Sequence, residues 1–406
     1  MMLNGVEVMR PAPLRAVETG VPTPLDKCPA ELADGWLVHA AALRRRLNTL
    51  LFPGQALMVY EGRDPSSGGA FAHGVPNTTW LSAATLLQDK RMTRDLLAEA
   101  GIPVPAGRTF SLKRGRPFAK EFAAELGYPV RVKPMIGEST VEVFDDVQNE
   151  ASLDAVLDYL DIVPTRRPDF TTSSYAFTQI LTPRSAESER TRGTYRYVVE
   201  ETVPGEYVRF LLVRGEVVSC LHLPEGPWGA AAAAREILEE LHPDFLAFAQ
   251  RVAQALPGLA AMALDVRTAD FSAGLDAQQP VVIEVSERPW LQAQCWTTNA
   301  DPDYLAGLLL KEGVPDAGET SPEENDVTVV FRWEGLSKVS EDARTLEEIS
   351  EKLPVALQIT EEDSVSGILM GRMEGAPRLV ALLNELAAES NLLSAPAMAV
   401  ETRCGN

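Results

Sequence analysis

The stretch from 195 to 223, YRYVVEETVPGEYVRFLLVRGEVVSCLHL, decides the fold class of this chain. It contains three runs with alternating apolar residues, separated by the short turns PGE (204–206) and RGE (214–216). Such runs predict strands, and short turns that contain glycine join antiparallel neighbours. We therefore expect an antiparallel meander here. A helical run at about 231–256 follows it, which makes the chain a mixed α/β protein.

Two predicted strands downstream of the meander each carry one acidic residue. The runs AMALDVRT (261–268) and PVVIEVS (280–286) place Asp265 and Glu284 between apolar neighbours, with the acidic loop 269–279 between them. Carboxylates are rarely buried unless they are paired or bind a metal. If the strands are neighbours, the two side chains converge and can hold Mg²⁺ together with nucleotide phosphates. The alternative is that both face solvent, and the spacing alone does not decide between the two.

Upstream of the meander, a lysine stands at the end of a predicted strand. The strand PVRVKP (129–134) carries Lys133 and runs into the loop MIGEST (135–140). A glycine in such a loop lets backbone N–H groups approach phosphate oxygens, and the lysine adds a fixed positive charge. The alternative is an ordinary hairpin with a lysine whose charged end reaches solvent.

The two ends of the chain predict further structure. We expect a small α/β region in residues 1–80, with a helix over 36–51 and a strand over 56–60. Residues 313–326 have the composition of a linker. Residues 326–406 then predict strand, helix, strand, strand, helix, strand, which is the βαββαβ order of a ferredoxin-like module.

Composition narrows the function classes. The chain has 406 residues, of which 45% are hydrophobic and 23% charged, so it is globular rather than disordered. A net charge of −21 argues against a nucleic-acid binder or a protein that binds anionic membranes. The four cysteines are far apart and predict neither a zinc site nor a disulfide framework. No apolar run is long enough for a signal peptide or a membrane span, so we expect a cytoplasmic protein.

Taken in order, these motifs resemble the ATP-grasp superfamily of carboxylate–amine ligases, which includes D-alanine–D-alanine ligase and the L-amino-acid ligases. DKRMTRDLLAEAGIPVP, PVRVKP, VVEETVPGEYVRFLLVRGEVV, LDV and IEVSERP occur in the family's order and at its spacing, within about 80–310. The resemblance implies an ATP-grasp fold over 81–312, with a small lid subdomain at about 110–203 and a central subdomain at about 204–312. It makes residues 1–80 an α/β N-terminal domain.

The resemblance also implies an ATP site. Lys90 and Lys133 match two lysines that contact the ATP phosphates, and Ser139 lies in the flexible loop that closes over the nucleotide. Three hinge positions match residues that hold adenine, partly through backbone groups: Glu200, Glu201 and Val203. Glu206, after the PG turn, matches the carboxylate that binds the ribose hydroxyls.

The implied metal ligands are Asp265 and Glu284, with Glu284 bridging two Mg²⁺ ions, for which Mn²⁺ can substitute. Arg288 matches an arginine that steadies the transferring phosphate or the acyl phosphate, and Arg209 stands where related ligases carry an arginine that faces the active cleft. The sequence departs from the family at Ser286, where relatives have a metal-binding asparagine. A hydroxyl is a poorer ligand for a hard cation than an amide carbonyl, so whether one or two ions bind stays open.

The implied reaction is ADP-forming amide synthesis. A substrate carboxylate attacks the γ-phosphate of ATP, and an amine then attacks the acyl phosphate. A closing loop at 135–140 and a lid from 164–194 would keep water out. We expect small-molecule partners, an amino acid or other small carboxylic acid and an amine or amino acid, with dipeptides among the products. A peptide acceptor, a nucleotide-binding regulatory protein weakened at Ser286, and a homodimer stay open. His222 faces either substrate or solvent.

Overall fold

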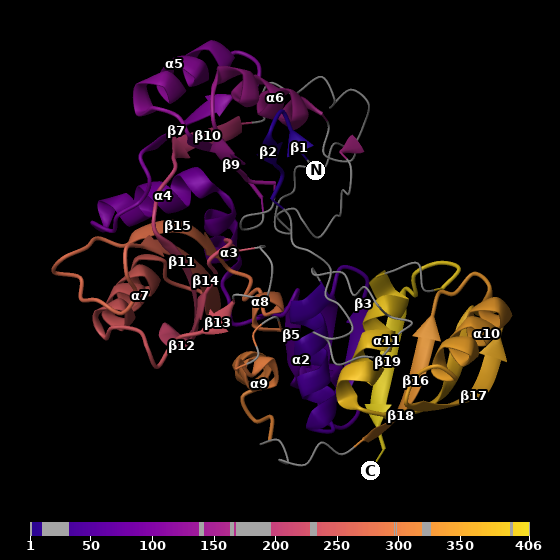
Figure 1. Ribbon diagram of the computed structural model, residues 1–406. Helices are drawn as coiled ribbons and strands as arrows, with labels where there is room; N and C mark the ends of the chain where they lie inside the picture. The colour runs from indigo at the N-terminus through magenta and orange to yellow at the C-terminus, as the bar shows by residue number, and fades with distance from the viewer. Residues whose placement is uncertain are drawn as a thin grey trace. The chain divides into compact units, whose positions relative to one another are not determined.

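The computed structural model describes residues 2–9, 32–137, 142–162, 166–167, 196–227, 234–295, 297, 299–318, 326–389 and 393–405. These residues form two compact units. The first unit holds the described residues of Met1–Pro11 and Trp80–Glu287, and the second holds those of Ala12–Thr79 and Arg288–Asn406. Figure 1 shows both, with the elements labelled as in the text.

A four-stranded antiparallel sheet of the first unit has the order β7-β10-β8-β9. Its strands are β7 (Gly107–Ser111), β10 (Arg196–Glu201), β8 (Val130–Pro134) and β9 (Phe144–Val147). Residues of α5 (Arg116–Leu126) and α6 (Glu150–Asp161) pack with Val130, Val132 and Val199 in one core cluster. Because side chains alternate along a strand, Lys133 and Glu200 lie on the sheet's other face. The short strands β1 (Met2–Leu3) and β2 (Val6–Glu7) form a separate hairpin.

The predicted meander is present only in part: its second and third strands, β11 and β12, pair in a five-stranded antiparallel sheet of the first unit, order β13-β12-β11-β14-β15, whereas its first strand is β10 of the four-stranded sheet. Its strands are β13 (Arg235–Glu236), β12 (Glu216–His222), β11 (Glu206–Val213), β14 (Ala261–Thr268) and β15 (Val281–Ser286). The PGE turn needs its glycine: Gly205 has φ +114°, and a Cβ there would lie 2.3 Å from the carbonyl oxygen of Thr268. The hairpin predicted around RGE is confirmed, whereas the one predicted around PGE is wrong, because PGE connects strands of two different sheets.

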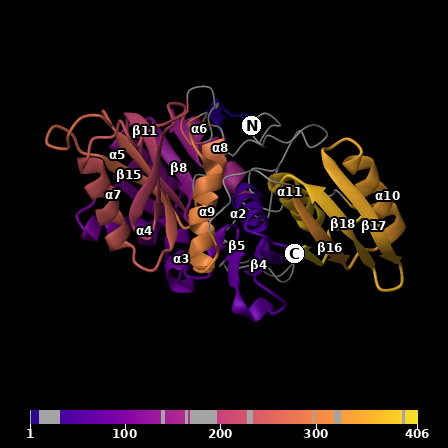
Figure 2. The same ribbon diagram turned by 90° about the horizontal axis from the view of Figure 1, so that it is seen from below.

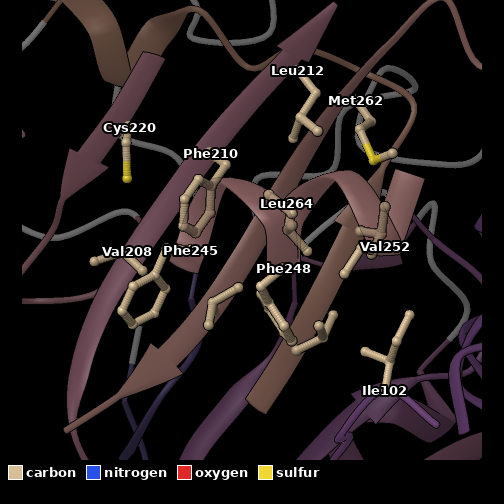
Figure 3. Packing of buried hydrophobic residues seen from close by; sticks show 14 of the residues in the cluster. Ile102, Val208, Phe210, Leu212, Cys220, Phe245, Phe248, Val252, Met262 and Leu264 are labelled. Atoms are coloured by element: carbon tan, nitrogen blue, oxygen red, sulfur yellow. The ribbon is translucent and has the colours of Figure 1, made fainter. Parts of the chain in front are cut away.

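The five-stranded sheet buries one face against α7 (Asp244–Ala255). Phe210 and Leu264 of the sheet pack with Phe245 and Phe248 of the helix, as Figure 3 shows. The opposite face carries the polar side chains. A bulge where Asp265 gives way to Val266 breaks the pairing of β14 with β15 and leaves Ile283 without a paired residue. Bulges of this kind reset which side chains face which way near functional sites.

The helices α3 (Leu81–Gln88) and α4 (Lys90–Glu99) precede the four-stranded sheet in the chain. Asp89 separates them and caps α4, since its side chain accepts hydrogen bonds from the backbone N–H groups of Arg91 and Met92. This cap fixes Lys90 as the first residue of the helix.

The second unit contains one eight-stranded sheet, order β17-β18-β16-β19-β3-β4-β5-β6. Its strands are β3 (Asn48–Phe52), β4 (Ala56–Tyr60), β5 (Gly69–Ala72), β6 (Val75–Pro76), β16 (Val327–Glu334), β17 (Val355–Asp363), β18 (Ile368–Gly375) and β19 (Ala399–Cys404). Its helices are α2 (Ala33–Arg44), α8 (Gln292–Cys295), α9 (Pro302–Gly313), α10 (Val339–Ser350) and α11 (Pro377–Glu389), with a 3-10 turn at Pro65–Ser67. Helix α10 packs on β17 and β18 (Figure 2).

The expected βαββαβ order is present from β16 to β19, but its sheet does not stand alone. Strand β19 pairs with β3, with Val400 opposite Leu51, so residues near both ends of the chain share one sheet. Helix α11 also packs against α2. The structure thus groups the residues of the three predicted parts 1–80, 81–312 and 326–406 differently. The sequence did not predict this grouping, because a strand pairing between such distant residues leaves no local periodic signal.

Two helix predictions were wrong in extent. The helix expected over 36–51 ends at Arg44, and Asn48–Phe52 form β3, because Arg46 adopts φ +58° and turns the chain. The helix expected over 231–256 begins only at Asp244 among the described residues, since Arg235–Glu236 pair with β12. No helix in the described ranges is both long enough and apolar enough to cross a membrane.

The core of the first unit provides a test of this packing. Phe245 is fully buried, whereas Phe118 on α5 is 64% exposed. We expect Phe245→Ala to lower the free energy of unfolding by about 3–5 kcal/mol, because it leaves a cavity under the five-stranded sheet. Phe118→Ala should change it by less than about 0.5 kcal/mol. Urea unfolding followed by far-UV circular dichroism measures both, and equal midpoints for the two variants would contradict this packing.

Candidate active site

Two lysines and two glutamates form a chain of ion pairs in the first unit. The Nζ of Lys90 lies 3.1 Å from Oε1 of Glu284, and the Nζ of Lys133 lies 3.5 Å from Oε2 of the same residue. Lys133 also lies 2.9 Å from Oε1 of Glu200. All four residues are buried. Because removing each charge from water costs several kcal/mol, these groups depend on one another for compensation.

The fold brings these four side chains from three places. Lys133 and Glu200 project from the free face of the four-stranded sheet, Glu284 comes from β15 of the five-stranded sheet, and Lys90 begins α4. The Nζ of Lys133 also donates to the backbone carbonyl of Ile283, at 3.2 Å, which is the residue that the bulge leaves without a pair. The bulge therefore supplies one acceptor and sets the position of the neighbouring carboxylate.

The loop after Lys133 is tied to the start of α4. The backbone N–H of Lys90 donates to the carbonyl of Met135 at 2.9 Å, and its Nζ donates to the carbonyl of Gly137 at 2.9 Å. These two hydrogen bonds therefore hold residues 135–137 against Lys90. Ser139 and the Arg-rich stretch beyond Arg167 lie outside the described residues.

A small cavity of about 30 Å³ lies beside the ion pairs. One part of its lining is the charged set already described, and the rest is mostly apolar, with Leu97, Val104 and Val198. This volume holds about one or two water molecules. A cavity of this size is too small to hold a nucleotide.

A second buried cluster surrounds Asp265. The Nε and Nη2 of Arg209 donate to Oδ1 and Oδ2 of Asp265 at 2.6 and 2.8 Å, and the hydroxyl of Tyr207 donates to Oδ2 at 2.6 Å. Arg209 and Asp265 are register partners on β11 and β14. Burial, and then the Asp265 carboxylate, raises the pKa of Tyr207 well above its ordinary value, so the hydroxyl keeps its proton.

The expected metal-binding residues share one face of the sheet. Asp265 stands opposite Glu284, and Ser286 stands opposite Ala263, two residues along each strand. All three expected ligands are buried. Within the part of the chain that the structure describes, no group of three or more His, Cys, Asp or Glu side chains is arranged to hold a metal. The donors on this face are two carboxylates and one hydroxyl, all of them oxygen.

The hinge residues occupy different environments. Glu200 is buried against Lys133, whereas Glu201 is exposed and its Oε1 accepts from the backbone N–H of Ala106 at 2.9 Å. A backbone hydrogen bond from Glu201 to the carbonyl of Ala106, also 2.9 Å, closes this contact. Val203 is half-buried in the connection between β10 and β11. Of these three hinge residues, Glu200 lines the cavity and the other two do not.

Glu206 lies apart from the lysines. As the first residue of β11 it alternates with Tyr207, so its side chain leaves the sheet on the face opposite Arg209. Its Oε2 is buried without a hydrogen-bond partner among the described residues. Burial lowers the pKa of His222, and the Glu206 carboxylate opposes this shift. The residue expected to bind ribose thus faces His222 in this structure.

Arg288 belongs to the second unit, where it is fully buried. Its Nη2 lies 3.5 Å from Oδ2 of Asp34, and its guanidinium lies 4.3 Å from the ring centre of Trp290. Asp34 also accepts from the backbone N–H of Leu291 at 2.6 Å. Burial, and then Arg288, lowers the pKa of His73 to about 3, so that ring is neutral.

Sequence reasoning missed two residues that the structure ties to this region. Tyr207 contacts Asp265, and its position two residues before Arg209 in a strand was a usable signal, since such residues share a face. Gln88 donates to Oε1 of Glu287 at 2.5 Å, which ties Glu287 to α3. No pattern in the sequence predicts that contact.

Comparison with known proteins gives sequence relatives of greater length. No protein-family model matches the chain. The chain is 24% identical to the cyanophycin synthetase of Geminocystis herdmanii over 285 residues, which is 59% of this chain and 32% of that protein. It is 25% identical to the cyanophycin synthetase of Crocosphaera subtropica over 258 residues, 52% of this chain and 29% of that protein. The chain spans about a third of the length of these curated relatives.

Solved structures similar to this chain include two ligase-related proteins. D-alanine–D-alanine ligase from Bacillus anthracis complexed with ATP matches with a TM-score of 0.39 and 16% identity, covering 59% of this chain and 68% of that one. A RimK domain protein ATP-grasp from Sphaerobacter thermophilus matches with a TM-score of 0.37 and 18% identity, covering 57% and 69%. With its motifs in the family's order and cyanophycin synthetases among its sequence relatives, this chain resembles the ATP-grasp carboxylate–amine ligases.

Proposed function

We propose that this chain is an ATP-dependent ligase that joins the carboxyl group of an amino acid, or another small carboxylic acid, to an amine or amino acid. The reaction passes through an acyl phosphate and releases ADP and phosphate. The observation that carries the proposal is the buried chain Lys90–Glu284–Lys133–Glu200 beside an apolar cavity. Sequence similarity to cyanophycin synthetases supports a ligase.

The ion pairs suit exchange with a nucleotide. Phosphate oxygens of ATP would attract the ammonium groups of Lys90 and Lys133 away from Glu284, and the freed carboxylate is then available to a cation. Leu97, Val104 and Val198 offer an apolar surface for a base in the same cavity as Glu200. ATP therefore replaces one set of buried charge partners with another.

The oxygen donors on β15 fit a divalent cation bound together with ATP phosphates. Glu284 supplies a carboxylate and Ser286 a hydroxyl, which are ligand types that Mg²⁺ accepts, and Mn²⁺ accepts them as well. When bound, such a cation neutralises phosphate charge and polarises the γ-phosphate. Glu284 and Ser286 would hold the ion.

The chain's own residues then perform the remaining tasks. Lys90 and Lys133 hold the phosphates and balance the charge that moves during transfer, because phosphoryl transfer depends mainly on positioning and electrostatics. Arg288, whose charge is permanent, is proposed to steady the acyl phosphate. The tether between residues 135–137 and Lys90 couples the loop after β8 to the lysine that contacts phosphate.

Lys133 provides the first test of this site. We expect Lys133→Met to lower ATP turnover by about 10²–10³-fold, since it removes a charge aimed at the phosphates. We also expect AMPPNP to raise the melting temperature of the wild type but not of this variant. Lys120→Met is the matched control and should behave as wild type, because the described ion pairs of Lys120 are with Glu150 and Asp154 of α6, neither of which lines the cavity. Wild-type turnover by a folded Lys133→Met protein would contradict the assignment.

The products test the reaction itself. Pairs of amino acids mixed with ATP, Mg²⁺ and the full chain should release ADP and phosphate in a substrate-dependent way. Nucleotide chromatography and phosphate release measure this, and the product mass distinguishes a dipeptide from a modified peptide. Formation of AMP and pyrophosphate would contradict an acyl-phosphate route.

A further inference from the structure

We propose that the active site of this chain takes one divalent cation rather than two, because Arg209 occupies the carboxylate on which a second ion would depend. The proposal rests on the proposed function, since the cation binds with ATP. It concerns Asp265, which the family resemblance assigns to the metal, and it follows from the contacts of that residue.

Both oxygens of Asp265 are engaged. Arg209 contacts Oδ1 and Oδ2 with its Nε and Nη2, and Tyr207 adds a third hydrogen bond to Oδ2. A guanidinium fork matches a carboxylate in geometry and charge, and paired N–H donors of this kind make the strongest contacts available to it. The oxygens of Asp265 are therefore already satisfied by protein donors.

The strand register holds Arg209 next to Asp265. Arg209 and Asp265 are direct neighbours across β11 and β14, and Tyr207 projects from the same face two residues before Arg209. All three side chains are buried. If Asp265 turned to a metal, it would give up two hydrogen bonds from a buried guanidinium, and Arg209 cannot lose its proton to relieve its charge.

Glu284 differs from Asp265 in its partners. Its oxygens meet the ammonium groups of Lys90 and Lys133, which sit on flexible stems and have ATP phosphates as alternative partners. Nucleotide binding therefore releases Glu284 and leaves Asp265 held. Glu284 and Ser286 then provide ligands for one ion, which is sufficient for Mg²⁺ bound mainly through phosphates. The positive charge of Arg209 stands beside Asp265, where the second ion would bind.

The fit of the residues is thus good for one ion and poor for two. The substitution at Ser286 agrees with this, because the position offers a hydroxyl where the family's two-ion site uses an amide oxygen. Both features reduce the donors available to a second cation, and they do so at separate places on the same face of the sheet.

Counting bound Mn²⁺ tests the proposal without relying on turnover. The full chain is incubated with AMPPNP and increasing Mn²⁺, free Mn²⁺ is measured by electron paramagnetic resonance, and bound nucleotide is measured on the same samples. We expect one Mn²⁺ per bound AMPPNP in the wild type. Two Mn²⁺ per bound nucleotide would overturn the one-ion proposal, whereas failure of the chain to bind AMPPNP at all would overturn the proposed function.

Variants of the pair test the role of Arg209. We expect Arg209→Leu to bind a second Mn²⁺, because it frees Asp265, and the double variant Arg209→Leu/Asp265→Asn to return to one. The double variant removes both buried charges and so controls for folding as well as for stoichiometry. A folded Arg209→Leu protein that still binds one Mn²⁺ per nucleotide would overturn the role of Arg209.

Discussion

The buried chain Lys90–Glu284–Lys133–Glu200 is the constraint on which the first unit depends. Lys133 of the four-stranded sheet meets Glu284 of the five-stranded sheet, so these ion pairs join the two layers that face the cavity. Apolar clusters stabilise the outer face of each sheet, with α5 and α6 on one and α7 on the other. Ion pairs thus connect the inner faces of the two sheets, whereas hydrophobic burial stabilises their outer faces.

Much of the fold was predictable where the signal is local. The hairpin of β11 and β12, the helix α6 and the βαββαβ order follow from alternation, helical periodicity and a glycine turn. The join between β19 and β3 was not predictable, since no local pattern records which distant strand fills a sheet edge. Strand β3 was missed because apolar residues before and after the turn at Arg46 fit one helical period.

The candidate site divides in the same way. The family resemblance assigned Lys90 and Lys133 to the phosphates, Glu200 to adenine and Glu284 to a metal. These roles stay predictions, but the structure brings the four side chains together. Their mutual pairing was not visible, because ion pairs between strands depend on register and on a bulge. Glu206, which the resemblance assigned to ribose, stays a prediction: alternation along β11 places its side chain on the face opposite Arg209.

The shared sheet of the second unit has a consequence for synthesis of the chain. Strand β3 emerges from the ribosome early, but its partner β19 extends to Cys404, and the segment Trp80–Glu287 of the first unit is translated between them. An apolar strand edge therefore waits unpaired while most of the chain is made, a state that favours pairing with other molecules. Folding of the first unit can proceed in that interval, whereas the sheet that contains β3 is completed last.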